Sequence, residues 1–209
     1  MEVRNCNAWI QKDGGDEYGV DYNKVKGYVL PEFEFTYTER DLIIYALGVG
    51  AASGDPTSND VLRWTYENHR QFGALPTFGV IAPFDCVCQL MSVPGLRFNP
   101  ALLLHGETEL TVHAPIPTAA TLYNRGHIVD IYDKGKASIV VVSVDSFDKD
   151  GTKIFTNVYS FFIRGIGGFG GPSGPAVKAP PSEPPKRAAD VVVREQTLPS
   201  QALLYRLAG

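Results

Sequence analysis

The stretch that decides the fold is Ala137-Ser138-Ile139-Val140-Val141-Val142-Ser143-Val144-Asp145-Ser146-Phe147, in which β-branched residues dominate. Such residues favour strands because the branched Cβ packs well on a pleated sheet. Polar turns flank the run, Asp133-Lys134-Gly135-Lys136 before it and Asp148-Lys149-Asp150-Gly151 after it. Residues 137–147 are therefore predicted to form a strand between two tight turns.

Further strands are predicted on both sides of this hairpin pattern. Residues 120–132 precede the first turn, and residues 154–163, rich in tyrosine and phenylalanine, follow the second. Residues 107–113 alternate between polar and apolar side chains, which predicts a half-buried strand. Strands of about ten residues joined by short polar turns predict an antiparallel meander.

A helix is predicted before the strands. Thr38 and Asp41 have the spacing of a capping box, and Gly48 and Gly50 are placed to end the helix or to allow close packing. Apolar residues follow the cap at helical spacing, at Leu42, Ile43, Tyr45, Ala46 and Val49. One helix against one curved antiparallel sheet defines the predicted fold class, α+β.

The other segments before the sheet carry weaker patterns. Residues 1–30, broken by glycines, are predicted to be a loose N-terminal arm, and the interleaved residues 61–66 a short strand. The apolar stretch after Pro76 contains Pro83 and Pro94, so any helix in it is expected to be short or broken.

Composition changes after the last predicted strand. Six glycines and six prolines occupy 12 of the 26 positions from 165 to 190, which predicts a linker without a core of its own. Beyond it, residues 191–193 (Val-Val-Val) are predicted to form a strand. A last helix is predicted to begin at Pro199-Ser200, with Leu203, Leu204 and Leu207 on one face.

The overall composition excludes several classes of protein. The 209 residues allow one or two domains, and 44% hydrophobic with 20% charged residues excludes a wholly disordered chain. No run of 18 apolar residues is present, so no membrane span is expected. The first residues lack the apolar core of a secretory signal and the last lack a peroxisomal address, so no targeting signal is expected in this chain.

Net charge limits the classes of ligand that the chain can bind, and the cysteine count bears on its redox environment. A net charge of −4, without a cluster of Lys or Arg, argues against nucleic acid but permits a small anionic ligand held by a few cations. The odd number of cysteines, Cys6, Cys86 and Cys88, fits a reducing compartment. Cys86 and Cys88 are expected to be buried thiols, and no metal or other cofactor is expected.

Three motifs have both a structural and a functional interpretation. Residues 165–170 match Gly-x-Gly-x-x-Gly, but Pro172 prevents the helix that a dinucleotide site needs. His105, followed by Gly106, lies where a strand begins, and both a structural and a ligand-binding role remain open. The turn containing Lys134 either presents a cation to a phosphate or is simply solvated. No Ser/His/Asp set can be assembled.

Seven segments, in order, resemble the type 2 enoyl-CoA hydratases, the MaoC-like hydratase part of peroxisomal multifunctional enzyme type 2. They are Phe35–Asp41, Tyr45–Ala51, Leu75–Phe78, Leu102–Glu107, Asp133–Gly135, Gly167–Gly171 and Ser200–Leu207. The resemblance covers roughly residues 28–209. It implies a double hot-dog fold, in which each half wraps a curved antiparallel sheet around a helix.

The resemblance also implies a division of the chain and an activity. Residues 31–164 would be the N-terminal hot-dog, 165–190 the linker and 191–209 the start of a second, truncated hot-dog. The family hydrates trans-2-enoyl-CoA to (3R)-3-hydroxyacyl-CoA, in peroxisomal fatty-acid β-oxidation. Its catalytic Asp and His lie in an Asp-x-Asn-Pro-x-His motif beyond the segment matched by residues 205–209, so no catalytic residue is expected here.

What the resemblance carries over is binding. It places His105, Gly106 and Lys134 at positions that contact acyl-CoA. The partners it implies are acyl-CoA, the C-terminal hot-dog half and a second copy in a homodimer. The isolated chain is expected to be the inactive, substrate-binding half of the hydratase. Two alternatives remain: a self-associating, non-catalytic hot-dog scaffold and, less favoured, a hot-dog acyl-CoA thioesterase.

Overall fold

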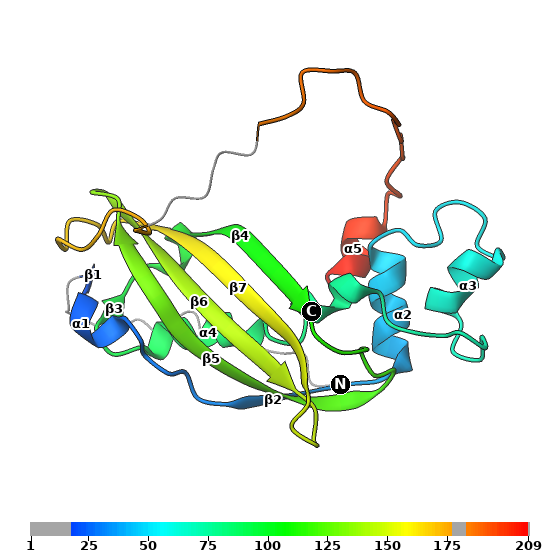
Figure 1. Cartoon of the computed structure of the whole chain (residues 1–209), viewed down its shortest axis with the longest axis horizontal. Coiled ribbons are helices and arrows are strands. Elements are labelled where there is room, and N and C mark those ends of the chain that lie inside the picture. The colour runs from blue at the N-terminus through cyan, green and yellow to red at the C-terminus, as the bar shows by residue number, and fades with distance from the viewer. Residues whose placement is uncertain (1–17, 177–182, 209) are drawn as a thin grey trace.

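A five-stranded antiparallel sheet organises the computed structural model, which describes residues 18–176 and 183–208 (Figure 1). The strand order is β2-β5-β6-β7-β4. The bounds are Phe33–Tyr37 (β2), Leu103–Val112 (β4), Ala120–Asp133 (β5), Ala137–Phe147 (β6) and Lys153–Arg164 (β7). The predicted meander is therefore confirmed as β5-β6-β7, and the predicted bounds of residues 137–147 are those of β6.

One face of the sheet is buried and the other is partly open. Along β6, Val140, Val142 and Val144 are fully buried, whereas the intervening Ile139 and Val141 are half-buried on the opposite face. This alternation follows from the two-residue period of a strand. The open face is therefore apolar as well, which matters for the site described below.

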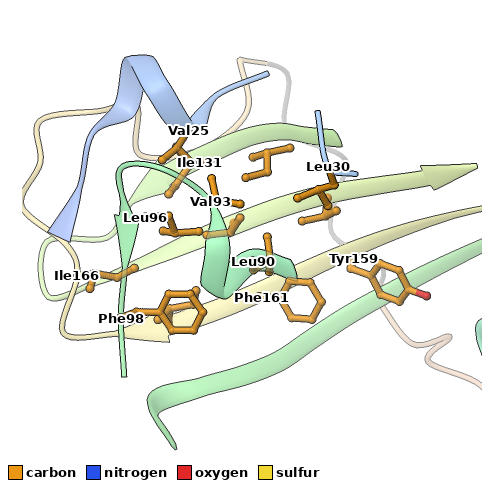
Figure 2. Packing of buried hydrophobic residues seen from close by; sticks show 14 of the residues in the cluster. Val25, Leu30, Leu90, Val93, Leu96, Phe98, Ile131, Tyr159, Phe161 and Ile166 are labelled. Atoms are coloured by element: carbon orange, nitrogen blue, oxygen red, sulfur yellow. The ribbon is translucent and has the colours of Figure 1, made fainter. Parts of the chain in front are cut away.

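Two clusters fill the buried face. The first surrounds the later part of a broken helical stretch, and this part lies behind the sheet in Figure 1; the earlier part packs in the second cluster. The buried members of the first cluster, several of which are labelled in Figure 2, include Val25, Leu30, Leu90, Val93, Leu96, Phe98, Ile131, Tyr159, Phe161 and Ile166. The stretch consists of η2 (Pro76–Val80), α4 (Asp85–Gln89) and η3 (Leu90–Ser92), so the prediction of short or broken helices is confirmed.

The second cluster lies beneath helix α2 (Glu39–Gly48). Asp41 Oδ2 accepts hydrogen bonds from the backbone N–H and hydroxyl of Thr38, at 2.8 and 2.9 Å, which confirms the predicted cap. Tyr45 then meets Phe78 edge to face at 5.5 Å, which joins α2 to the broken helical stretch.

Two predictions for the N-terminal third are wrong. Residues 18–30 are not a loose arm, because β1 (Gly19–Val20) pairs with β3 (Leu96–Arg97) and α1 (Tyr22–Val25) inserts Val25 into the core; residues 1–17 lie outside the described residues. Residues 61–66 do not form a strand but belong mostly to helix α3 (Asn59–Thr65). Ser58 caps α3 by accepting from the Val61 N–H, a start signal that precedes the predicted strand.

The C-terminal prediction is partly correct. Residues 191–193 form no strand and are 68–76% exposed, on the long arch in Figure 1. The last helix exists as α5 (Gln201–Tyr205), packed on α2. Leu203 and Leu207 are exposed, however, and the contact with α2 is made by Tyr205, whose ring lies 6.1 Å from that of Tyr45.

None of the helices among the described residues is long and apolar enough to cross a membrane. Cys88 is half-buried in α4, whereas Cys6 and the side chain of Cys86 lie outside the described part of the chain. The short helix η4 (Pro100–Leu102) leads directly into β4.

Candidate functional site: a cavity on the open face of the sheet

A cavity of about 480 Å³ lies on the open face of the sheet. Its apolar lining includes Ile139 and Val141 from β6 and Phe162 from β7, side chains that alternation directs away from the core. Polar groups come from Glu107 on β4 and from Lys134 in the β5–β6 turn. An apolar surface with a few polar groups around it is the usual composition of a small-molecule site.

Gly106 brings β4 to this cavity through a β-bulge. His105 pairs with Phe161 and Glu107 with Ser160, so Gly106 is the extra residue between two successive pairs. A Cβ at Gly106 would lie 3.1 Å from the carbonyl oxygen of Ser160, a tight approach. The absence of a side chain therefore allows the edge strand to lie close against β7 at the mouth of the cavity.

Lys134 supplies a cation. Its Nζ donates a hydrogen bond to the backbone carbonyl of Ser173, so the ammonium is held beside the segment that contributes Pro175 to the cavity. The Asp133–Lys136 turn that carries it is not merely solvated. A lysine ammonium at the edge of an apolar surface is suited to an anionic group such as a phosphate.

The segment from 165 to 175, here called the glycine loop, corrects the prediction of a linker without a core. Ile166 is only 2% exposed and belongs to the first cluster, and Phe169 stacks on Tyr22 at 6.2 Å. The glycine loop is therefore attached to the sheet. No helix follows the Gly-x-Gly-x-x-Gly match within the described residues up to 176, in keeping with the sequence argument against a dinucleotide site.

His105 faces the other side of the sheet. Its ring lies 5.3 Å from Phe161 and 5.7 Å from Tyr159, both core residues, and stacks on Phe84 at 6.3 Å. Its Nε2 is 2.5 Å from the hydroxyl oxygen of Thr108. Of the three residues predicted to bind ligand, the structure brings Gly106 and Lys134 to one cavity and places His105 outside it.

A second polar cluster does not form a nucleophilic site. Thr156 Oγ1 lies 2.5 Å from Asp145 Oδ1 and 2.9 Å from His113 Nε2. The hydroxyl donates to the carboxylate, so it accepts from the histidine and is not activated by it. Lys153 also binds Asp145, at 2.8 Å. No group of three potential metal-ligating side chains occurs in the part of the chain that the structure describes.

Sequence reasoning missed most of the cavity lining. Five lining residues carry no motif that marks them as ligand contacts: Tyr132, Ile139, Val141, Ser160 and Phe162. Strand alternation nevertheless assigns Ile139 and Val141 to one face once Val140 is placed in the core. Pro175 carried no local signal, because its place depends on how the glycine loop folds back over the sheet.

Comparison with known proteins identifies the family. The family model described as the MFE-2 hydratase 2 N-terminal domain matches residues 35–165, and the chain belongs to this family. A "Probable enoyl-CoA hydratase 2" of Dictyostelium discoideum is 38% identical over 193 residues, covering 91% of this chain and 63% of its own length. The "Enoyl-CoA hydratase 2, peroxisomal" of Arabidopsis thaliana is 38% identical over 86% of this chain and 62% of its own length.

A solved structure supports the fold. The MaoC-like dehydratase of Phytophthora capsici superposes with a TM-score of 0.71 at 29% identity, covering 90% of this chain and 63% of that one. The predicted class, an α+β hot-dog with a curved antiparallel sheet, is confirmed. The chain spans a little under two thirds of the length of these relatives.

Proposed function

We propose that this chain is the acyl-CoA-binding N-terminal half of a (3R)-specific trans-2-enoyl-CoA hydratase. One observation carries the proposal: Gly106 and Lys134, which the family resemblance names as ligand contacts, line the same cavity from strand β4 and from the β5–β6 turn. Two of the three matched residues thus meet at one cavity from segments far apart in the sequence, which supports that cavity as the ligand site, whereas His105 lies outside it.

The chemistry of acyl-CoA suits the cavity. Coenzyme A carries phosphates, for which Lys134 supplies a cation, and the pantetheine arm is long enough to cover the apolar lining formed by Ile139, Val141 and Phe162. Two sequence-matched contacts and a complementary surface therefore support binding of the same ligand.

Turnover needs a set of catalytic groups in addition to a binding cavity. Hydration adds hydroxide from water to the β-carbon and a proton to the α-carbon, which needs a base and an acid together with donors to the thioester oxygen. The family motif Asp-x-Asn-Pro-x-His does not occur in these residues. We infer that the chain on its own binds acyl-CoA without hydrating it. The C-terminal hot-dog half, a second copy in a homodimer and a peroxisomal location belong to the same proposal.

Binding and turnover are tested separately. Decanoyl-CoA, which has no double bond to hydrate, is titrated calorimetrically into the 209-residue chain. Binding is expected, and Lys134→Ala is expected to weaken it about tenfold. Lys149→Ala, in the corresponding turn of the β6–β7 hairpin, is the matched control. Equal losses in the two variants, or no binding by the wild type, would refute the binding proposal. Appreciable hydration of crotonyl-CoA would refute the inactivity.

A second role, self-association, rests on the edge strand β4. It lies at one end of the sheet order, and Leu104 and Val112 on it are 47% and 42% exposed. An exposed edge with apolar side chains invites pairing with another chain. Sedimentation velocity is expected to show a dimer that Val112→Lys disrupts; a monomer at high concentration would contradict this role.

A further inference from the structure

One residue of the sheet, Asp133, makes several hydrogen bonds to the glycine loop. Asp133, the last residue of β5, accepts hydrogen bonds from three backbone N–H groups. Its Oδ1 accepts from Gly135 at 2.7 Å and Gly168 at 2.8 Å, and its Oδ2 accepts from Gly170 at 2.8 Å. The backbone N–H of Asp133 donates to the carbonyl of Pro172 at 2.8 Å. One residue thus contacts the glycine loop at three points.

The glycines make this contact possible. A Cβ at Gly167 would lie 2.5 Å from the carbonyl oxygen of Gly135 and 2.6 Å from the Ala137 nitrogen, so the two backbones touch. Gly168 and Gly170 have φ values of +79° and +80°, the left-handed region in which glycine is unstrained. The backbone can therefore direct two N–H groups, two residues apart, at the same carboxylate.

The contact between Asp133 and the glycine loop also affects where the Lys134 ammonium lies. Lys134 follows Asp133 directly, and its Nζ donates to the carbonyl of Ser173 in the glycine loop. Pro175, two residues further along, lines the cavity together with Lys134. The position of the ammonium and that of this part of the cavity wall therefore both depend on where the glycine loop lies.

We propose that Asp133 is a positioning residue, whose carboxylate holds the glycine loop so that Ser173 and Pro175 set Lys134 and the wall of the cavity for an anionic ligand. The N–H groups of Gly168 and Gly135 also hold the pKa of the Asp133 carboxyl below its ordinary value, so the acceptor is charged at neutral pH. Asp133 contacts no ligand atom in this role; it acts through the glycine loop. The ligand part of the proposal rests on the proposed function.

The chain offers a matched control at the other end of the sheet. Asp148 begins the β6–β7 turn and accepts from the N–H groups of Asp150 and Thr152, at 2.9 and 2.8 Å. It thus organises a hairpin turn as Asp133 does, but no loop from elsewhere in the chain reaches it among the described bonds. Asp148→Asn removes the charge from a turn alone, whereas Asp133→Asn removes it from a turn and from the contact with the glycine loop.

The test compares wild type, Asp133→Asn, Asp133→Glu and Asp148→Asn as full 209-residue chains. An asparagine keeps one acceptor oxygen and presents an NH₂ group at the other position, so it cannot accept at both carboxylate positions. Asp133→Asn is expected to raise amide exchange in residues 166–175 and to weaken decanoyl-CoA binding about tenfold. Asp148→Asn is expected to do neither, at a similar melting temperature. Asp133→Glu, which retains the charge, is expected to restore part of the affinity.

The two readouts separate this proposal from the proposed function. Unchanged exchange in residues 166–175 of Asp133→Asn would overturn the positioning role, whatever the affinity. Faster exchange with wild-type affinity would overturn the link to the ligand. If the wild type binds no decanoyl-CoA, the proposed function fails, and faster exchange confined to residues 166–175 still supports Asp133 as the residue that positions the cavity wall.

Discussion

Alanine at position 48 should have two opposite effects, because it should stabilise helix α2 through helix propensity and weaken the packing of α5 against it. Gly48 is the last residue of α2, and a Cβ there would lie 2.8 Å from the Tyr205 Cα and 3.2 Å from its nitrogen. These are backbone atoms of α5, which cannot rotate away. To reach 3.4 Å, where ordinary contact begins, the backbone of α5 must retreat by about 0.6 Å.

The two effects have comparable sizes and act on different elements. Alanine in place of glycine stabilises a helix by up to about 1 kcal/mol, which benefits α2. A gap of 0.5–1 Å removes roughly a quarter to a half of the dispersion energy at a contact, and an aromatic pair such as Tyr45–Tyr205 contributes about 0.5–1.5 kcal/mol. With the other lost contacts, docking of α5 should weaken by about 1–2 kcal/mol, or roughly 5–30-fold.

Hydrogen exchange can measure the loss of α5 docking separately from the stability of the rest of the fold. A helix of five residues has little stability alone, so undocked α5 should unfold. In Gly48→Ala, amides of residues 201–208 are expected to exchange roughly 5–30-fold faster, while those of β6 and β7 change little. Gly54→Ala, whose Cβ meets no atom within 4 Å, is the control. Unchanged exchange at residues 201–208, or an equal increase across the sheet, would refute the reasoning.

Other expectations concern the core. Phe155→Ala removes a fully buried ring and should lower the free energy of unfolding by about 3–5 kcal/mol in urea titrations; a loss below 1 kcal/mol would contradict its placement. Ser146→Ala removes the hydroxyl that donates to the buried side-chain Oδ1 of Asn124 at 2.6 Å and should cost about 1–3 kcal/mol; a neutral result would mean that the bond contributes nothing. Tyr37→Phe loses the hydrogen bond to the Pro117 carbonyl, about 1 kcal/mol at pH 7. Burial raises the pKa of Tyr37, so the wild type should lose stability as pH rises above about 10, and Tyr37→Phe should lose less; parallel losses would contradict this.

Strands bounded by turn signals were predictable from the sequence. β6 has exact bounds because Gly135 and Gly151 mark its neighbouring turns and β-branched residues fill the space between them. Residues 191–193 show the limit of the same signal. β-propensity measures how a side chain fits a paired, half-buried surface, and this segment pairs with no described strand.

Long-range contacts account for most of the errors. The glycine loop has the composition of a linker, and the groups that hold it, among them the carboxylate of Asp133, lie far from it in the sequence. Residues 18–30 carry no clear hydrophobic period, because Gly19 and Gly27 interrupt them, yet Val25 and Leu30 are buried beneath a sheet formed much later in the chain. In both cases the contacting residues lie far away in the sequence, so a local sequence pattern cannot reveal the contact.

The site was half predictable for a related reason. Lys134 and Gly106 came from family resemblance, and the apolar lining follows from alternation along β6. The side to which His105 turns depended on a bulge that no local motif marks, because glycine at a strand start is also compatible with a simple turn.

That bulge has a consequence for how the chain can vary in length. His105 and Glu107 would share a face in a regular strand, but the extra residue puts His105 against the core and Glu107 at the cavity. Removing one residue at the bulge, from His105 to Glu107, would leave both flanks of β4 facing as they do now, whereas removing a residue further along the strand would reverse the part between the gap and the bulge. Among homologous sequences, a one-residue gap within β4 is therefore expected at the bulge, and elsewhere in the strand only substitutions.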